Sequence, residues 1–250
     1  MMKKKVPYLY NVSKEIPSSH DIAINHTHKS LPKDVKKYWK NRYSLFKKFD
    51  SGIELTTELW YSVTPEDIAL FTAKFLKYCY PDDTKILDLF CGGGGNTIQF
   101  GRFFSKIYAL DYNEINLQCT LNNCQIYKIN SKKIIPLHCD FKSAVKDENF
   151  MNFCHDNIDI IYSSPPWGGP SYTNDEVFDL NDLKPFGFEE LLTYCLKISN
   201  KVVFFLPRNS NLKQLSLINR KLKIENSRVI YMKLQGRIKG ISVFYGDNFL

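Results

Sequence analysis

The chain lacks several features that mark common protein classes. No run of about 18 apolar residues occurs in its 250 residues, so no membrane-spanning helix is expected. The basic N-terminus, MMKKK, is not followed by an apolar stretch, which argues against a secretory signal peptide. The seven cysteines are odd in number and contain no CxxC pair. We therefore expect reduced thiols in an intracellular protein rather than a disulfide framework.

A metal site is not indicated either. Cys119 and Cys124 have no partner His or Cys at zinc-finger spacing, and we expect both to be buried thiols. His26 and His28 lie in a polar stretch that is better explained as a loop. The composition, 44% hydrophobic and 24% charged, is that of a folded chain with one sizeable core. No internal repeat or low-complexity segment occurs.

Negative charge is scarce relative to positive charge. The chain has 34 Lys and Arg against 26 Asp and Glu, a formal net charge of +8. A basic surplus favours a polyanionic partner such as nucleic acid or an anionic membrane surface. A generally basic surface without such a partner would give the same count, so charge alone leaves both explanations open.

The N-terminal third is predicted to be irregular and then helical. Residues 1–32 are polar and contain three prolines, which predicts an irregular arm. Residues 33–49 mix apolar and basic side chains at helical spacing and predict a basic amphipathic helix. A second helix is expected over residues 64–80, with Thr64 as N-cap and Pro65 in the first position. The pattern predicts a helical extension over 33–81.

Residues 82–250 show the alternation of an α/β domain. Short apolar runs are separated by helix-length segments, which indicates parallel βαβ units, and the last two runs form a hairpin. Five parallel strands followed by a hairpin make the Rossmann-like, seven-stranded sheet of a class I methyltransferase. The expected strands cover residues 85–90, 106–111, 133–140, 158–163, 201–207, 227–234 and 240–246.

A glycine loop follows the first expected strand. The segment DLFCGGGGN starts at Asp88, and glycines there allow close approach of a ligand to the backbone. The absence of a following Lys-Ser/Thr argues against a P-loop. Asp111 ends the next strand, where an acid can accept both ribose hydroxyls. Asp140 ends the third strand, where many methyltransferases read the adenine amino group.

The acid before the glycines separates two cofactors. A dinucleotide brings a pyrophosphate that Asp88 would repel, whereas S-adenosylmethionine brings a sulfonium and an ammonium. The sequence therefore favours S-adenosylmethionine over NAD. Residues expected to bind it are Asp88, Phe90, Cys91, Gly92, Gly93, Asn96, Thr97, Asp111 and Asp140.

The fourth expected strand ends in SPPW, formed by Ser164, Pro165, Pro166 and Trp167. It resembles the (Asn/Asp/Ser)-Pro-Pro-aromatic signature of amino-group methyltransferases. A conjugated amine is a poor nucleophile, so acceptors must hold its hydrogens and aim its lone pair. The Ser164 hydroxyl and the Pro165 carbonyl are the candidate acceptors, and Trp167 offers a flat face for a base. Catalysis would rest on orientation, without a strong general base.

Several segments together resemble the trimethylguanosine synthase family of RNA cap guanosine-N2 methyltransferases. The resemblance extends from about residue 37 to the C-terminus. It implies conversion of 7-methylguanosine caps of small nuclear and nucleolar RNAs to 2,2,7-trimethylguanosine, in the nucleus and its nucleolus, with ribonucleoprotein proteins as further partners. The matching segments are KYWKNRYSLFKKFDSGI, LWYSVTPE, LDLFCGGGGNTIQF, SSPPWGGPSY, FLPRN and GISVFYGD.

The resemblance also implies roles for single residues. Trp167 would stack on the methylated guanine and Ser164 would face its N2, while the extension over 33–81 contributes to cap binding. Ser62 and Thr64 would border the cofactor and cap pockets. The residues implied to grip the cap triphosphate are Lys37 and Arg208, with Asn209 nearby.

Three alternatives remain open on the residues alone. SPPW would also suit an adenine N6 or ribosomal RNA guanine N2 methyltransferase, although the expected basic helix and the WYSVTPE and LPRN segments argue against one. A cap-binding module without catalysis should have lost Asp111 or SPPW, and both are intact. A general nucleotide-binding scaffold would not need SPPW.

Overall fold

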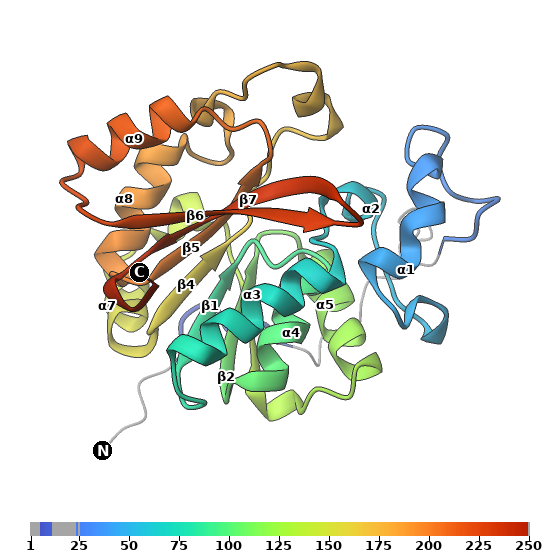
Figure 1. The fold of residues 1–250 in the computed structure, drawn as a ribbon. Coiled ribbons are helices and arrows are strands. Elements are labelled where there is room, and N and C mark those ends of the chain that lie inside the picture. Colours follow the sequence, from blue (N-terminus) through green and yellow to red (C-terminus); the bar gives the residue numbers. More distant parts are fainter. Residues whose placement is uncertain (1–5, 12–23, 25, 250) are drawn as a thin grey trace.

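The computed structural model describes residues 6–11, 24 and 26–249, and its centre is one twisted sheet (Figure 1). The strand order is β3-β2-β1-β4-β5-β7-β6, with β7 antiparallel to both neighbours and the other pairs parallel. This confirms the predicted seven strands and the C-terminal hairpin. The strands are β1 Lys85–Leu89, β2 Lys106–Asp111, β3 Ile134–His138, β4 Ile160–Ser163, β5 Val202–Pro207, β6 Ser227–Leu234 and β7 Arg237–Tyr245.

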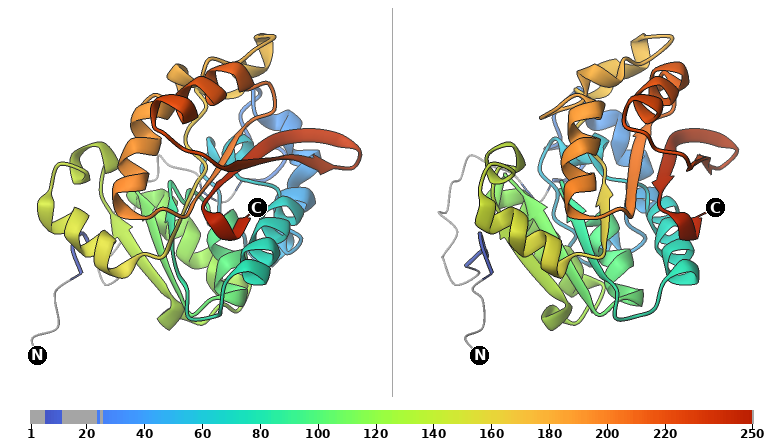
Figure 2. Two further views of the ribbon diagram at one scale, coloured as in Figure 1. Left: turned by 60° about the vertical axis from the view of Figure 1, so that its left-hand side comes forward. Right: turned by 90° about the vertical axis from the view of Figure 1, so that its left-hand side faces the viewer.

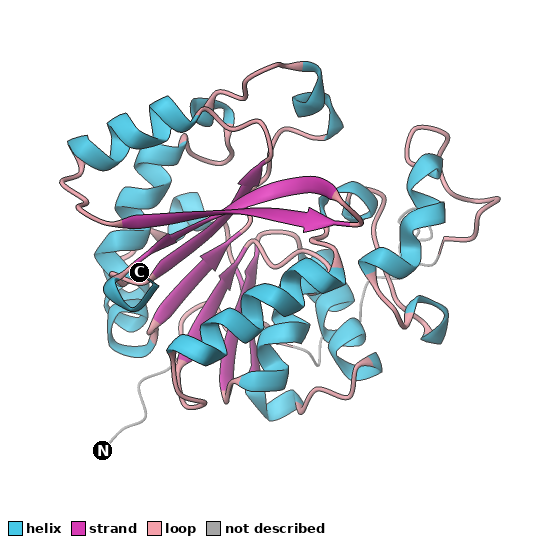
Figure 3. Cartoon of the chain, in the orientation of Figure 1, coloured by secondary structure: helices cyan, strands magenta, loops and turns pink. Residues whose placement is uncertain are grey.

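Helices cover both faces of the sheet, as the two further views show (Figure 2; coloured by element in Figure 3). Helices α3 to α5 pack on one core cluster and α6 to α9 on the other. Strand β1 serves both, because Ile86 joins the first cluster and Leu87 and Leu89 join the second. Such two-sided burial explains why the central strands are continuous apolar runs. The longer helices are α3 Glu66–Cys79, α4 Gly95–Phe103, α5 Glu114–Ile126, α7 Glu148–Asn157, α8 Phe188–Ile198 and α9 Leu212–Lys221.

Short helical turns also occur in the part of the chain that the structure describes. They lie in the N-terminal segment, in the loops at the ends of the strands and at the C-terminus. They are η1 Lys36–Asn41, α1 Arg42–Leu45, η2 Phe49–Ser51, α2 Leu59–Ser62, η3 Ser131–Lys133, α6 Phe141–Ala144, η4 Pro170–Asn174, η5 Leu180–Asp182 and η6 Asp247–Phe249.

The single amphipathic helix predicted over 33–49 is wrong. The segment instead forms η1, α1 and the start of η2. The rings of Trp39 and Phe49 lie 5.6 Å apart and both pack on Trp60. Ten residues of straight helix would separate them by about 15 Å. Burying both aromatic rings in one cluster therefore requires the chain to fold back.

The helix predicted over 64–80 is confirmed as α3, but its start differs. Pro65 occupies the N-cap position and no side chain caps the helix. The hydroxyl of Thr64 instead accepts a hydrogen bond from Asn96 Nδ2 at 3.0 Å. The residue that resembled a cap therefore connects the segment before α3 to the first turn of α4.

The predicted N-terminal arm lies partly outside the described residues. Its described part pairs with the outer edge of β3, where Leu9 bridges Leu137 in antiparallel fashion. Tyr10 N donates to Pro136 O at 2.9 Å. The arm thus extends the sheet at this edge.

The cysteines behave as expected. All seven are free thiols, and Cys119 and Cys124 are buried. Among the residues that the structure describes, no group of His, Cys, Asp or Glu has the arrangement of a metal site. The described helices include none long and apolar enough to cross a membrane.

Candidate active site

The register of the central strands gathers the predicted residues at one edge. Leu89 of β1 pairs with Leu110 on one side and with Ser163 on the other. Asp111 and Ser164 follow these partners directly, so they lie on either side of the glycine loop that leaves β1. The carboxyl end of a parallel sheet is the usual ligand-binding edge of such folds. The strand pairing therefore brings the expected cofactor and base-binding segments together.

The glycine loop takes a backbone path that few residues tolerate. Cys91 N donates to Leu110 O at 2.9 Å, which turns the chain at the end of β1. Phe90 has a φ of 66° and Gly92 a φ of 54°. A positive φ is unusual for a bulky residue and is often found at functional sites. The Phe90 ring packs edge-on against Phe141, 6.0 Å away.

One glycine of this loop has a reason that the sequence did not reveal. A Cβ on Gly93 would lie 3.0 Å from Leu55 and 3.2 Å from Leu59. These leucines belong to the N-terminal segment before and within α2. Close packing of the chain on itself thus favours glycine here, whereas the sequence suggested only an approach to a ligand.

Two buried carboxylates lie at this edge. Asp88 is 1% exposed and accepts a hydrogen bond from the Thr97 hydroxyl. Burial raises the pKa of Asp88 to about 7, and the neighbouring charge of Asp111 adds to the shift. Burial also raises the pKa of Asp111 to about 6, although hydrogen bonds from Asn113 N and Gly92 N, both 2.9 Å long, oppose it. Both groups would be stabilised in their charged forms by a cationic ligand.

Two further predicted cofactor residues pair with each other. Asn96 donates to Thr64, and both side chains are buried. The other polar atom of Asn96, Oδ1, is buried without a hydrogen-bond partner among the described residues. A buried carbonyl oxygen in this state is costly unless a ligand or water donates to it.

Asp140 lies two residues beyond the end of β3 rather than on it. It is exposed and caps α6, where its oxygens accept from Lys142 N at 3.1 Å and Ser143 Oγ at 2.8 Å. Its carboxylate therefore already satisfies a helix N-terminus, and any role in adenine recognition would use its remaining lone pairs.

The SPPW loop holds Trp167 half-buried between aromatic rings. The Trp167 ring meets Tyr172 at 5.0 Å in a T-shaped contact and Phe205 at 5.4 Å. Its indole nitrogen is buried without a hydrogen-bond partner in the described part of the chain. Gly168 and Gly169 follow with φ of 81° and 85°, and a Cβ added to either would meet no atom within 4 Å. Conformation, rather than crowding, explains these two glycines.

Asn209 fastens the loop that follows Trp167. Its Nδ2 donates to Tyr172 O at 3.1 Å and to Asp175 O at 2.9 Å. Its backbone carbonyl accepts from Phe178 N at 2.8 Å. Sequence reasoning gave Asn209 a place near the triphosphate. In the structure its amide nitrogen is committed to the loop, so it positions Tyr172 and, through it, Trp167.

Three predicted substrate residues are exposed. Arg208 follows the end of β5 and interacts electrostatically with Tyr172, opposing the rise in the pKa of Tyr172 that burial causes. Lys37 lies in η1, with its ammonium 5.2 Å from the centre of the Tyr38 ring. The Ser62 hydroxyl donates to Glu58 O at 3.0 Å within α2.

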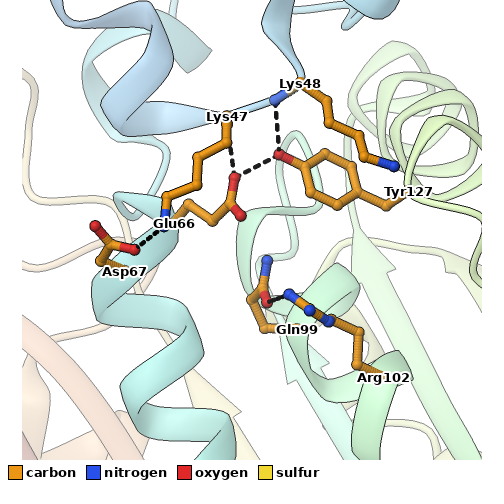
Figure 4. A network of polar contacts seen from close by, with 7 residues as sticks. All are labelled: Lys47, Lys48, Glu66, Asp67, Gln99, Arg102 and Tyr127. Carbon is orange, nitrogen blue, oxygen red and sulfur yellow. Dashed lines mark hydrogen bonds and ion pairs between the residues drawn. The ribbon is translucent and has the colours of Figure 1, made fainter.

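A polar network fixes the N-terminal segment to the methyltransferase domain (Figure 4). The buried carboxylate of Glu66 on α3 accepts from Lys47 N at 2.7 Å and from the hydroxyl of Tyr127, at the end of α5. Tyr127 accepts in turn from Lys48 N at 3.3 Å. An exposed ion pair joins the Lys47 side chain to Asp67. The segment that carries Lys37 is therefore held at a defined place relative to the glycine loop.

Sequence reasoning missed Glu58. Its Oε1 accepts from Asn116 Nδ2 at 2.9 Å, and its charge contributes to the raised pKa values of Asp111, Tyr61 and Tyr112. The contact spans elements far apart in the sequence, and no local pattern marks it. Only its position just before LWYSVTPE could have drawn notice.

The chain is similar to known methyltransferases in sequence and in fold. The profile of a family described as RNA cap guanine-N2 methyltransferase matches residues 83–248. Trimethylguanosine synthase of Saccharomyces cerevisiae is 45% identical over 85% of this chain and 68% of its own length. The protein of the same name from Schizosaccharomyces pombe is 40% identical over 74% of this chain and 76% of its own.

Among solved structures, a human methyltransferase 10 domain containing protein superposes with a TM-score of 0.56 at 13% identity. The superposition covers 85% of this chain and 98% of the human protein, which confirms the class I methyltransferase fold. The family profile covers most of the chain and both synthases exceed 30% identity over two thirds of their length. The chain belongs to the RNA cap guanine-N2 methyltransferase family.

Proposed function

We propose that the chain transfers methyl groups from S-adenosylmethionine to the N2 atom of 7-methylguanosine caps, giving 2,2,7-trimethylguanosine caps. The family and its synthase relatives support this reaction. The observation that carries the proposal for this site is the pairing of Leu89 with Ser163, which sets the SPPW loop beside the glycine loop. We propose small nuclear and nucleolar RNAs as the substrates, and the nucleus with its nucleolus as the place of action.

The residues at the carboxyl ends of β1 and β2 fit a cationic nucleoside. S-adenosylmethionine, when bound, supplies a methyl group on a positively charged sulfur. The two buried carboxylates Asp88 and Asp111 have raised pKa values and the charge of Asp111 raises that of Asp88, so a cation at this edge would offset their desolvation. Asp111 retains lone pairs for hydroxyl donors beyond its two backbone hydrogen bonds. The Oδ1 of Asn96, which has no hydrogen-bond partner among the described residues, offers one more acceptor.

The SPPW loop supports selection of an amino nitrogen. The Ser164 hydroxyl and the Pro165 carbonyl offer two acceptors for the hydrogens of N2. With both hydrogens held, the nitrogen moves toward a tetrahedral geometry and its lone pair points out of the ring plane. Pro165 and Pro166 have no N–H, so they add no donor that competes for these acceptors. The attacked nitrogen becomes acidic only after transfer, so water can take the proton.

Trp167 supports selection of the methylated base. Tyr172 and Phe205 hold its ring from two sides and fix its plane. A 7-methylguanine ring is cationic and gains more from an indole face than a neutral guanine does. Lys37 and Arg208 are exposed cations and would meet the triphosphate, while Asn209 keeps the Trp167 loop in place.

The decisive experiment is mass spectrometry of a 7-methylguanosine cap dinucleotide incubated with the protein and S-adenosylmethionine. Two successive increases of one methyl group, both mapped to N2 by fragmentation, are expected. An uncapped oligonucleotide of the same length is the control. Methylation of the oligonucleotide but not of the cap would instead identify an amino methyltransferase for another base. Cap binding without any mass increase would identify a non-catalytic cap-binding module.

A further inference from the structure

The β6–β7 hairpin extends beyond the edge of the sheet that carries the site. Gly240 of β7 pairs with Pro207, the last residue of β5. Residues 237–239 of β7 and their partners in β6 therefore continue past the end of β5. At about 3.4 Å per residue they extend roughly 10 Å beyond it. The hairpin projects from the body of the molecule in both views of Figure 2.

The projecting tip is positively charged. The two strands and their turn carry Arg228, Lys233, Arg237 and Lys239 and no Asp or Glu. Lys233 and Arg237 are exposed, and neither forms an ion pair with another residue that the structure describes. Their charges are therefore available to an anionic partner.

The tip is also firmly supported. On β6 the side chains of Ile230, Met232 and Leu234 pack against the core cluster shared with α3, and Met232 is 4% exposed. The alternate residues Tyr231 and Lys233 are exposed. The hairpin thus presents its charges from a backbone that is held by buried side chains.

The tip begins where β5 ends, next to Arg208. Arg208 directly follows Pro207, whose partner Gly240 is the point where the hairpin leaves the sheet. If the triphosphate of a cap lies near Arg208, the RNA chain attached to it leaves the site from this point. The cations of the tip lie just past this point, and no acidic side chain of the hairpin opposes a polyphosphate.

We propose that the tip of the β6–β7 hairpin, through Lys233 and Arg237, binds the phosphodiester backbone of the RNA chain that follows the cap. This inference rests on the proposed function, because it assigns the path of the same substrate beyond the triphosphate. The contacts are electrostatic and independent of base sequence. The hairpin makes a capped RNA a better substrate than a cap dinucleotide.

The test compares two substrates and two variants. kcat/KM is measured for a 7-methylguanosine cap dinucleotide and for the same cap on a 10-nucleotide single-stranded RNA, at two salt concentrations. The double variant Lys233→Gln/Arg237→Gln should keep its activity on the dinucleotide and lose much of the advantage of the RNA. Two lost contacts to a single strand reduce the salt slope by about 1.4. Between 50 and 200 mM salt, this is about a 7-fold smaller decline than in the unsubstituted protein.

The matched control is Lys128→Gln/Lys132→Gln. It removes the same charge from exposed positions before β3, at the amino ends of the strands. Its kcat/KM should be unchanged on both substrates. Equal losses on dinucleotide and RNA in the hairpin variant, or an unchanged salt slope, would overturn the proposal. Failure of the unsubstituted protein to methylate either substrate would overturn the proposed function instead. Fluorescence anisotropy with labelled RNA then decides the hairpin separately, because an unchanged salt slope in the double variant rejects it.

Discussion

The hydroxyl of Thr97 on α4 donates a hydrogen bond to the carboxylate of Asp88 on β1, and both side chains are almost fully buried beneath the glycine loop. This hydrogen bond favours the charged carboxylate, but burial outweighs it and raises the pKa of Asp88 to about 7. Asp111, which interacts with it, has a pKa raised to about 6 for the same main reason. Asp88 and Asp111 are therefore protonated to a larger extent at neutral pH than ordinary aspartates are.

The first prediction concerns pH. A carboxyl group whose pKa is higher in the folded than in the unfolded state stabilises the fold fully only below the unfolded pKa, near 4. This contribution is lost as pH rises through about 6 for Asp111 and about 7 for Asp88. The Tm of the ligand-free protein should decline between pH 5 and 8. Asp179 has a lowered pKa and titrates below this window.

Asp88→Asn is the informative variant for this prediction, because it removes the titration and keeps the shape of the side chain. Its Tm should vary less between pH 5 and 8 than that of the unsubstituted protein. Binding of S-adenosylmethionine should release protons, since the cation favours both carboxylates in their charged forms. Calorimetry in two buffers of different ionisation enthalpy measures this release, and a proton count of zero at pH 6.5 contradicts the prediction.

The second prediction concerns Asp111, which accepts from two backbone N–H groups at once. In Asp111→Asn the amide offers one acceptor in place of two carboxylate oxygens, so Gly92 N or Asn113 N faces a donor. Loss of a charged acceptor costs about 1.5–3 kcal/mol, or roughly 10- to 150-fold in cofactor affinity. Isothermal calorimetry checks this value. Asp147→Asn, at the N-cap of α7, where the carboxylate also accepts from a backbone N–H, is the comparison, and equal losses in the two variants would refute the special role of Asp111.

The third prediction concerns the polar network around Glu66 that is shown in Figure 4. Tyr127→Phe removes the hydroxyl that donates to Glu66 and accepts from Lys48 N, and should lower the free energy of unfolding by about 1–2 kcal/mol. Asp67→Asn breaks only the exposed ion pair with Lys47 and should cost less than about 1 kcal/mol. Urea unfolding measures both. The reverse order of the two effects would show that Glu66 does not anchor the segment.

The fourth prediction concerns the triphosphate. Arg208→Ala and Lys37→Ala remove exposed cations that are proposed to meet the triphosphate, so they should weaken binding of a capped triphosphate more than binding of 7-methylguanosine. The difference should shrink as salt rises, because exposed charges are screened. Fluorescence titration with the nucleoside and the cap nucleotide measures it. Equal losses for both ligands would exclude a phosphate role for these two side chains.

The sequence was sufficient for the strands and insufficient for the N-terminal segment. Buried parallel strands appear in the sequence as apolar runs, and their type follows from the alternation with helices. The fold of 33–49 depends instead on Trp39 and Phe49 meeting Trp60, a contact between distant residues that no local periodicity encodes. The helical spacing of apolar and basic residues in 33–49 therefore wrongly predicted one continuous helix.

The same distinction holds within the site. SPPW and the glycine loop were found because their chemistry requires particular residues at adjacent positions. Asn209 could be located but not understood, because its hydrogen bonds to the carbonyls of Tyr172 and Asp175 appear only when β5 and the loop after β4 come together. Glu58 could not be found at all, since it reaches Asn116 across the fold. Motifs identify what reacts, whereas the residues that hold it in place are identified by three-dimensional structure.

The last prediction is selectivity for guanine that is already methylated at N7. The Trp167 ring is held by Tyr172 and Phe205, so its plane is fixed before a base arrives. A cation over an indole face gains about 0.5–2 kcal/mol, which corresponds to roughly 2- to 30-fold in binding. A poorly stacked base also displaces N2 from the acceptors at Ser164 and Pro165. A displacement of about 1 Å can cost on the order of 100-fold in rate.

The two effects act on the same substrate, so an unmethylated guanosine cap should show little or no turnover. Trp167→Ala should abolish activity while binding of S-adenosylmethionine stays nearly intact, because the two carboxylates of the expected cofactor site, Asp88 and Asp111, lie on β1 and β2. Trp167→Phe should retain part of the activity, since a smaller ring still stacks. The measurement is kcat/KM for a 7-methylguanosine cap and for an unmethylated guanosine cap with each variant. Comparable values for the two caps in the unsubstituted protein would show that Trp167 does not read the charge of the methylated base.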